Sequence, residues 1–360
     1  MLLLSQEPKK AKWWSNEGRR VICELCPHLC RVNDGKIGIF GVRKNINGQL
    51  YTINYGKICV AAVDQIEKKP IFHYHPGSYL YSLGTFGCNL DCAGCQNFQL
   101  ARGRIPDIPC EIKSPEAVVA EALSKEVDGI AWTFNEPIVW SEFMIDTSII
   151  AKNKGLYSML NTNGFINKEA RDELLQCIDV MKIDIKSFSD ETYRTFCNGR
   201  LGPVLDTCIA AKDAGIHVEL AYLLIPGIND SSEEVNSLTN WVSEKMGADV
   251  PLHFFRFSPT YKLSNLNQES MERMAFAKKI ALDSGLKYVY FGGTISPDDQ
   301  ATYCPSCGEL LISRIGEEAS EKLFVKNAQV SRFCPTYSGI NVKINNGKCP
   351  RCRNQIKVIL

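Results

Sequence analysis

The stretch LGTFGCNLDCAGCQNFQL, residues 83–100, places Cys88, Cys92 and Cys95 at C-x3-C-x2-C spacing. It continues the run YLYSLGTF, residues 79–86, which is rich in aromatic and aliphatic residues and predicts a β-strand. The three thiols therefore lie in a loop directly after a strand. Iron–sulfur clusters normally take four thiolates, so three would leave one iron with an open coordination position. A structural zinc loop with a distant fourth ligand is the alternative, and three merely buried thiols fit the close spacing poorly.

Further β-rich runs follow this strand, and each run except the last precedes a stretch that can be helical. They cover residues 129–134, 155–161, 179–186, 216–224, 250–257 and 287–292. This order predicts parallel strands joined by right-handed helical crossovers. Ser114 and Pro115 suit the N-cap and the first position of the first long helix. We expect an α/β fold, a partial (β/α) TIM-like barrel that binds its ligands at the carboxyl ends of the strands.

The composition restricts the class of protein. The chain has 360 residues, enough for one large α/β domain with small appendages. Its 41 Lys and Arg residues nearly balance its 40 Asp and Glu residues, so no overall field attracts nucleic acid. The first residues, MLLLSQEPKK, are too short an apolar run for a signal peptide, and no run approaches transmembrane length. We therefore expect a cytoplasmic protein with neither a nucleic-acid nor a membrane partner.

The chain contains 16 cysteines. Since no export signal precedes them, we expect reduced thiols, and their clustering in three groups indicates metal binding rather than disulfides. The groups divide the chain into three expected parts. These are a cysteine-bearing N-terminal module at 1–76, the barrel at 77–299 and a zinc-ribbon-like module at 300–360.

Two knuckles near the C-terminus, CPSCG and CPRC, have the pattern of a four-cysteine zinc ribbon. Their candidate ligands are Cys304, Cys307, Cys349 and Cys352. Cys334 lies in the unusually long gap between the knuckles and is a competing thiol. Because four thiolates leave no open site, we expect a structural Zn²⁺ in a lid or docking module, with an auxiliary iron–sulfur cluster as the alternative.

Near the N-terminus, Cys23, Cys26 and Cys30 stand at C-x2-C-x3-C spacing, again one ligand short of a closed site. Cys59 follows a short β-like run, residues 49–56, which can fold back as a hairpin and bring the Cys59 thiol close. Zinc would take all four thiolates, whereas an auxiliary cluster tolerates three. An oxidisable remnant without metal is the third interpretation.

The central cysteine motif after a first strand resembles the signature of the radical S-adenosylmethionine (SAM) superfamily. Further motifs are similar, in sequence and order, to those of AmmeMemoRadiSam-system radical SAM enzymes, relatives of the glycyl-radical-enzyme (pyruvate formate-lyase) activating enzymes. They are IEKKPIFHYHPGS, TFNEP, NTNGF, DIK, LLIPGIND, HFFRFSP and TYCPSCGELLI. Similar enzymes carry another cysteine just before VR, where this chain has Phe40 nearby, and Cys59 is the replacement to consider.

This resemblance implies a 4Fe–4S cluster on Cys88, Cys92 and Cys95, with SAM chelating the remaining iron. Reductive cleavage of SAM would yield a 5'-deoxyadenosyl radical that abstracts a hydrogen atom from an unknown substrate. The resemblance also implies a reductant such as ferredoxin or flavodoxin, and functional association with AmmeMemoRadiSam-system proteins. A protein or peptide is one kind of substrate, and modification of a small molecule or peptide in an AmmeMemoRadiSam-type pathway is as plausible as activation of a partner protein. Activation of a glycyl-radical enzyme is one alternative, and a non-catalytic iron–sulfur and zinc protein for electron transfer or scaffolding is another.

The resemblance also implies a SAM-binding set beside the cluster. Its residues are Glu136, Asn161, Thr162, Asp184, Lys186 and His253. Glu136 would accept the amino group of SAM, and Lys186 would face its carboxylate as a point charge. Asn161 stands where an activase relative has an aspartate, so one negative charge of that relative's cation site is missing. A solvated loop carboxylate, a surface lysine and a core histidine remain the alternatives for Glu136, Lys186 and His253.

Overall fold

The computed structural model describes residues 8–104, 108–292, 296–317, 320–325, 328–333 and 336–360. Its centre is an eight-stranded sheet with the strand order β16-β15-β14-β13-β12-β11-β9-β8. The parallel strands are β9 (Tyr79–Gly84), β11 (Gly129–Trp132), β12 (Tyr157–Thr162), β13 (Val180–Ile185), β14 (His217–Leu224), β15 (Leu252–Arg256) and β16 (Val289–Gly292). β8 (Val60–Gln65) pairs antiparallel with β9 at one edge. Each parallel strand lies beside its successor in the chain, and the predicted parallel α/β arrangement is confirmed.

Helices connect the parallel strands and pack against them. The longer ones are α2 (Pro115–Ser124), α3 (Ser141–Asn153), α4 (Lys168–Leu174), α6 (Leu201–Asp213), α7 (Ser232–Trp241) and α8 (Met271–Asp283). The short turns are α1 (Phe98–Arg102), α5 (Asp190–Thr192), α9 (Pro297–Gln300), η1 (Ile66–Lys68), η2 (Pro137–Trp140), η3 (Tyr193–Cys197), η4 (Val242–Met246) and η5 (Tyr261–Leu263). Ser114 Oγ accepts a hydrogen bond from the Ala117 amide, so the predicted N-cap of α2 forms; such a cap stabilises a helix by about 1 kcal/mol.

An aromatic group joins β11 to α3 in the core. Trp132 and Trp140 meet edge-to-face with ring centroids 5.6 Å apart, and Trp140 stacks on Phe143 at 4.7 Å. All three side chains are buried. Burying each of them contributes about 2–3 kcal/mol, which fixes the helix against the strand that carries it.

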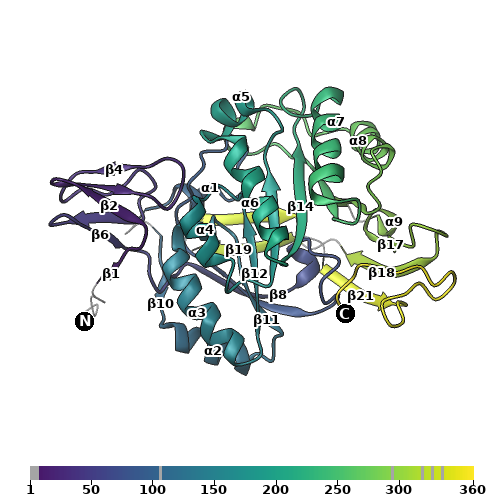
Figure 1. The fold of residues 1–360 in the computed structure, drawn as a ribbon, viewed down its shortest axis with the longest axis horizontal. Helices are drawn as coiled ribbons and strands as arrows, with labels where there is room; N and C mark the ends of the chain where they lie inside the picture. Colours follow the sequence, from purple (N-terminus) through teal and green to yellow (C-terminus); the bar gives the residue numbers. More distant parts are fainter. Residues whose placement is uncertain (1–7, 105–107, 293–295, 318–319, 326–327, 334–335) are drawn as a thin grey trace.

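The N-terminal module consists of small antiparallel sheets beside the barrel, drawn in purple in Figure 1. Its strands are β1 (Lys9–Lys10), β2 (Trp14–Glu17), β3 (Arg20–Cys23), β4 (Arg31–Val32), β5 (Arg43–Ile46), β6 (Gln49–Thr52) and β7 (Lys57–Ile58). Asn47 and Gly48 both have positive φ, which suits the two-residue turn of the β5–β6 hairpin. A buried ion pair of 2.6 Å between Arg43 and Glu142 ties the module to α3.

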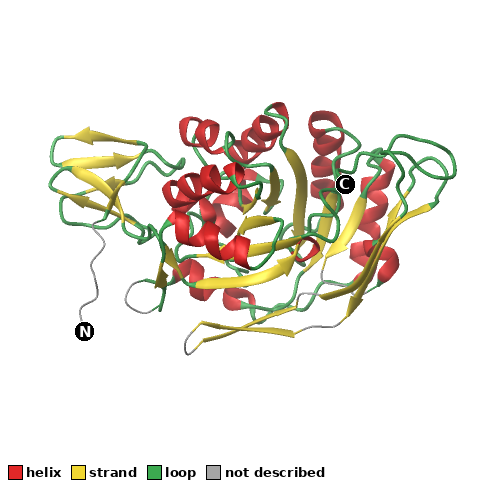
Figure 2. Ribbon diagram, turned by 90° about the horizontal axis from the view of Figure 1, so that it is seen from below, coloured by secondary structure: helices red, strands yellow, loops and turns green. Residues whose placement is uncertain are grey.

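The C-terminal module contains β17 (Thr302–Tyr303), β18 (Leu310–Glu317) and β21 (Thr336–Val342), and a separate hairpin of β19 (Ser320–Val325) and β20 (Ala328–Phe333), which Figure 2 shows as a long projection. Gln65 of β8 makes two hydrogen bonds to the backbone of Tyr337, at 3.0 and 3.1 Å, so this module packs on the barrel edge. Cys334 lies outside the described residues. Among the described helices, none is both long and apolar enough to cross a membrane.

Candidate functional site

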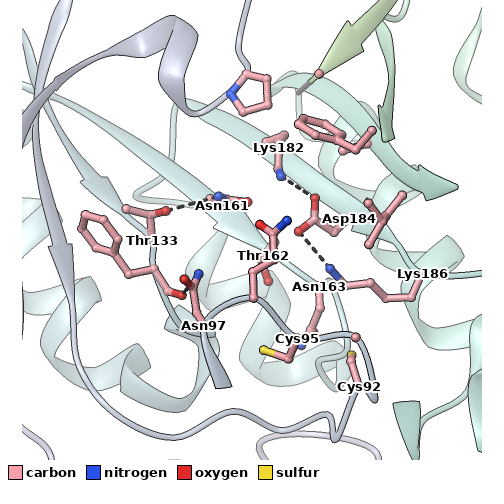
Figure 3. Close-up of a pocket in the computed structure, with 18 of the residues that line it drawn as sticks. Cys92, Cys95, Asn97, Thr133, Asn161, Thr162, Asn163, Lys182, Asp184 and Lys186 are labelled. Carbon is pink, nitrogen blue, oxygen red and sulfur yellow. Dashed lines mark hydrogen bonds and ion pairs between the residues drawn. The ribbon is translucent and has the colours of Figure 1, made fainter. Parts of the chain in front are cut away.

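A cavity of about 580 Å³ lies at the carboxyl ends of the parallel strands. Cys88, Cys92 and Cys95 line one part of it, together with residues that end β12 and β13. Figure 3 shows Cys92 and Cys95 at the bottom of the view, below Asn161, Asp184 and Lys186, and all five residues line the cavity. Its volume is typical of a small-molecule site. Ligands of open parallel sheets bind at this end of the strands, so the cavity occupies the position that the sequence predicts.

The loop that carries Cys88, Cys92 and Cys95 is held by its own backbone and by neighbouring loops. Gly87 begins it with φ of +92°, and a Cβ there would approach Val42 to 2.6 Å, so only glycine fits. Asn89 donates from Nδ2 to the Phe165 carbonyl at 2.6 Å. These contacts fix the loop that carries the three thiols.

The donor set fits an iron–sulfur cluster. Burial raises the pKa of the Cys95 thiol to about 11, and the pKa of Cys88 also lies well above its usual value because of burial. Buried thiols of this kind become thiolates only when a cation balances their charge. Cysteine thiolates are the usual protein ligands of iron–sulfur clusters.

Glu136 follows β11 and lies on the cavity wall with 4% of its surface exposed. Its Oε1 accepts hydrogen bonds from Thr162 Oγ1 at 2.7 Å and the Ile138 amide at 3.0 Å, and its Oε2 accepts one from the Asn163 amide at 2.8 Å. Burial raises the pKa of this carboxyl group to about 7. The structure therefore brings Glu136 and Thr162 together beside the cysteines.

Three charged side chains of one strand form the adjoining wall. Lys182, Asp184 and Lys186 alternate along β13 and its end, so they share one face, and Figure 3 shows Asp184 between the two lysines. The Lys186 Nζ lies 3.0 Å from Asp184 Oδ2. Burial would raise the pKa of Asp184, but the two lysines outweigh it and lower that pKa to about 2. Lys182 is absent from the predicted set, although the K-x-D-x-K alternation could have identified it.

Asn161 is the last residue but one of β12 and lines the same cavity, where its Nδ2 donates to Thr133 Oγ1 at 3.2 Å. His253 does not line it. Its ring is fully buried, with Nε2 2.6 Å from Glu219 Oε2. The expected SAM contact of His253 therefore does not fit this arrangement. The physical reason is that the buried Glu219 carboxylate needs hydrogen-bond donors. It accepts hydrogen bonds from the amides of Phe72 and His73, and the His253 ring lies against its other oxygen instead of in the cavity.

Cys59 is bonded to Cys110 in a disulfide. The antiparallel pairing of β7 with β10 (Glu111–Ile112) brings the two residues side by side. This finding corrects two expectations, because Cys59 is not a fourth thiol for the N-terminal group and not every cysteine is reduced. The N-terminal group therefore consists of three free thiols, Cys23, Cys26 and Cys30.

The N-terminal cysteines lie close to the central loop. His28, between Cys26 and Cys30, has Nε2 2.8 Å from the carbonyl oxygen of Asn89. Burial raises the pKa of Cys26 to about 12 and that of Cys30 to about 11. The buried Arg43 is the cation whose charge acts on Cys26. Cys23 and Cys26 are buried and Cys30 is partly buried, next to the candidate cluster site.

The four C-terminal cysteines converge as the knuckle pattern predicts. The sulfurs of Cys304, Cys307, Cys349 and Cys352 all lie within 4.8 Å of one another. The Cys304 and Cys352 sulfurs are 3.5 Å apart, and those of Cys307 and Cys349 are 3.7 Å apart. Such a set fits a four-coordinate metal-binding module.

Comparisons with known proteins show what this chain is similar to. A family model described as the radical SAM superfamily matches residues 82–238. The chain is 38% identical over 344 residues to an uncharacterized protein of Methanocaldococcus jannaschii. This alignment covers 96% of this chain and 97% of that protein. It is 23% identical to the pyruvate formate-lyase-activating enzyme of Clostridium pasteurianum over 216 residues, 56% of this chain and 87% of that enzyme. A crystal structure of a domain of pyruvate-formate lyase-activating enzyme from Bacteroides vulgatus aligns with a TM-score of 0.41 and 21% identity, covering 46% of this chain and 99% of the domain.

Proposed function

This chain belongs to the radical SAM superfamily, and from that premise we propose that it cleaves SAM reductively at a 4Fe–4S cluster held by Cys88, Cys92 and Cys95. The observation that carries the proposal is that these cysteines line one cavity with Glu136, Asp184 and Lys186. When bound, the cluster and SAM supply a 5'-deoxyadenosyl radical that abstracts a hydrogen atom from the substrate.

We assign the protein groups to the parts of SAM by charge. Lys186 offers a cation for the methionine carboxylate, and Asp184, held ionised by its two lysines, orients that cation. Glu136 offers an acceptor for the amino group, since its Oε2 accepts one protein hydrogen bond and retains a lone pair. Asn161 and Thr162 lie between these charges and contribute polar contacts.

The other cysteine groups are proposed as structural. The C-terminal four suit Zn²⁺, because four thiolates complete its tetrahedral shell. Cys23, Cys26 and Cys30 form a three-thiol candidate for an auxiliary metal. A reductant such as ferredoxin or flavodoxin would supply the electron. The proposed substrate is a protein or peptide, and the proposed partners are AmmeMemoRadiSam-system proteins.

Activation of a glycyl-radical enzyme is the second candidate function. The similarity to a pyruvate formate-lyase-activating enzyme over 56% of the chain favours it. The N-terminal and C-terminal modules of this chain add to that shared core. A purely electron-carrying or scaffold role is disfavoured, because it does not need a cavity of about 580 Å³ beside the cysteines.

The test is anaerobic reconstitution with iron and sulfide, followed by dithionite and SAM. We expect release of 5'-deoxyadenosine even without substrate, and its loss in Cys88→Ala, Cys92→Ala and Cys95→Ala. Cys208→Ala is the matched control, because Cys208 is fully buried in α6 and lies outside the cavity wall. Unchanged SAM cleavage in the three ligand variants would rule out the proposed function.

A further inference from the structure

Cys197 lies against the candidate cluster loop although it belongs to none of the three cysteine groups of the sequence. Its Sγ is 3.4 Å from Cys92 Sγ, within hydrogen-bonding distance for sulfur. Its side chain is fully buried, so water does not compete for this contact. It ends η3, about one hundred residues beyond Cys92, and only the fold brings the two thiols together.

Backbone hydrogen bonds on both sides of Cys92 hold this arrangement. The Asp91 amide donates to the Cys197 carbonyl at 2.7 Å, and the Ala93 amide donates to the Phe196 carbonyl at 3.1 Å. The cluster loop and the end of η3 are therefore pinned together at the two residues that flank Cys92. The fold therefore fixes the backbone positions of both cysteines.

The turn after Cys197 is shaped for the same contact. Asn198 adopts a left-handed conformation with φ of 54°, and the Gly199 amide donates to the Tyr193 carbonyl at 3.1 Å. A Cβ on Gly199 would approach the end of the Leu90 side chain in the cluster loop to 2.6 Å, so a larger residue there would displace Leu90. The two residues after the thiol thus pack closely with the cluster loop and η3.

In the structure the Cys92 thiol donates to Cys197 Sγ. A cysteine that ligates iron is a thiolate and can only accept, so once Cys92 binds iron, only the Cys197 S–H can form the hydrogen bond between the two sulfurs. Cys88 has a comparable donor, since the Leu90 amide lies 3.4 Å from its sulfur. Hydrogen bonds to the sulfurs of an iron–sulfur cluster are one of the factors that set its reduction potential.

Resting on the proposed function, we propose that Cys197 is a positioning residue that donates an S–H···S hydrogen bond to the Cys92 thiolate and thereby raises the reduction potential of the cluster. The reduced cluster carries one more negative charge than the oxidised cluster. A donor therefore stabilises the reduced form more, and the cluster accepts its electron at a less negative potential.

The experiment is a redox titration of reconstituted protein without SAM, followed by visible absorption and electron paramagnetic resonance, together with iron analysis. Cys197→Ala should keep the iron content of the wild type and shift the midpoint potential to a more negative value. Cys197→Ser should give an intermediate midpoint, because its hydroxyl group also donates but is shorter. Cys208→Ala, another fully buried thiol, should leave the midpoint unchanged.

The outcomes separate this inference from the proposed function. A wild-type chain that assembles no 4Fe–4S cluster overturns both. A wild-type cluster whose midpoint is the same in Cys197→Ala overturns the inference alone. Loss of iron in both Cys197→Ala and Cys197→Ser also overturns it, because Cys197 would then be a ligand and not a donor to one.

Discussion

Arg314 Nη2 donates a hydrogen bond to the carbonyl oxygen of Phe72 across 2.6 Å, and this contact joins the C-terminal module to the wall of the central cavity. Arg314 is fully buried on β18, and its other terminal nitrogen donates to the Gln300 carbonyl at 2.8 Å and to Thr302 Oγ1 at 3.0 Å. Phe72 and Gln300 both line the cavity. The C-terminal module therefore forms part of the site and is not a separate appendage.

Replacing Arg314 should destabilise the whole chain. Arg314→Leu leaves buried carbonyl oxygens without donors, which should lower the free energy of unfolding by about 3 kcal/mol or more. Denaturant unfolding of the reconstituted protein measures this loss. Arg20→Leu, at an exposed position of β3, is the control and should change stability little. Equal stability of the two variants would contradict the proposed role of Arg314.

Removing the Glu136 carboxylate should weaken SAM binding while leaving the cluster intact. A lost hydrogen bond to a charged group costs about 1.5 to 3 kcal/mol, so Glu136→Ala should bind SAM roughly ten- to a hundred-fold more weakly. Anaerobic calorimetry gives the affinity, and iron analysis reports on the cluster. The exposed Glu169 is the matched control, and Glu169→Ala should bind SAM normally. Wild-type affinity of Glu136→Ala would place Glu136 outside the SAM site.

Glu67 should make the folded chain less stable as the pH rises. Burial raises the pKa of this carboxyl group from 4.5 to about 7, so between these values the folded chain holds a proton that the unfolded chain has released. The unfolded chain then binds fewer protons, and stability falls as the pH increases through this window. The free energy of unfolding should therefore drop more between pH 5.5 and pH 8 in the wild type than in Glu67→Gln. An identical pH dependence of the two proteins would show that Glu67 titrates normally.

Single substitutions in the C-terminal knuckles should remove one metal ion and leave the central cluster in place. Cys307→Ser and Cys352→Ser each take one ligand from the four-cysteine group. Metal analysis should show the loss of one zinc equivalent with unchanged iron and brown colour. Substitution is preferable to truncation, since truncation would also remove Arg314 and Tyr337 from the barrel. A zinc content that stays at one per chain would refute the assignment.

The disulfide predicts the behaviour of Cys59. Because Cys59 is paired with Cys110, Cys59→Ser should match the wild type in both zinc and iron content. Peptide mapping without reductant should recover the two residues in one linked fragment. Loss of metal in Cys59→Ser would instead return Cys59 to the group of Cys23, Cys26 and Cys30.

Features that depend on residues close together in the chain could be predicted from the sequence. Alternation of β-rich and helical runs indicated the parallel strands, because each pattern reflects the side-chain period of its own element. The cysteine loop after β9 and the two knuckles could be recognised because their ligands are close in sequence. Strand direction then placed the loop at the carboxyl ends of the sheet, where the cavity lies.

Partners that lie far apart in the chain became visible only in the folded structure. Local pattern could not show that His253 would donate to the buried Glu219, because the need for a donor arises only when the carboxylate leaves water. The pairing of β7 with β10 decided that Cys59 meets Cys110. The backbone bonds between η3 and the cluster loop decided that Cys197 lies beside Cys92. Each of these contacts requires closure of a long loop, whose free energy depends on the packing of the whole fold and not on the residues near either end.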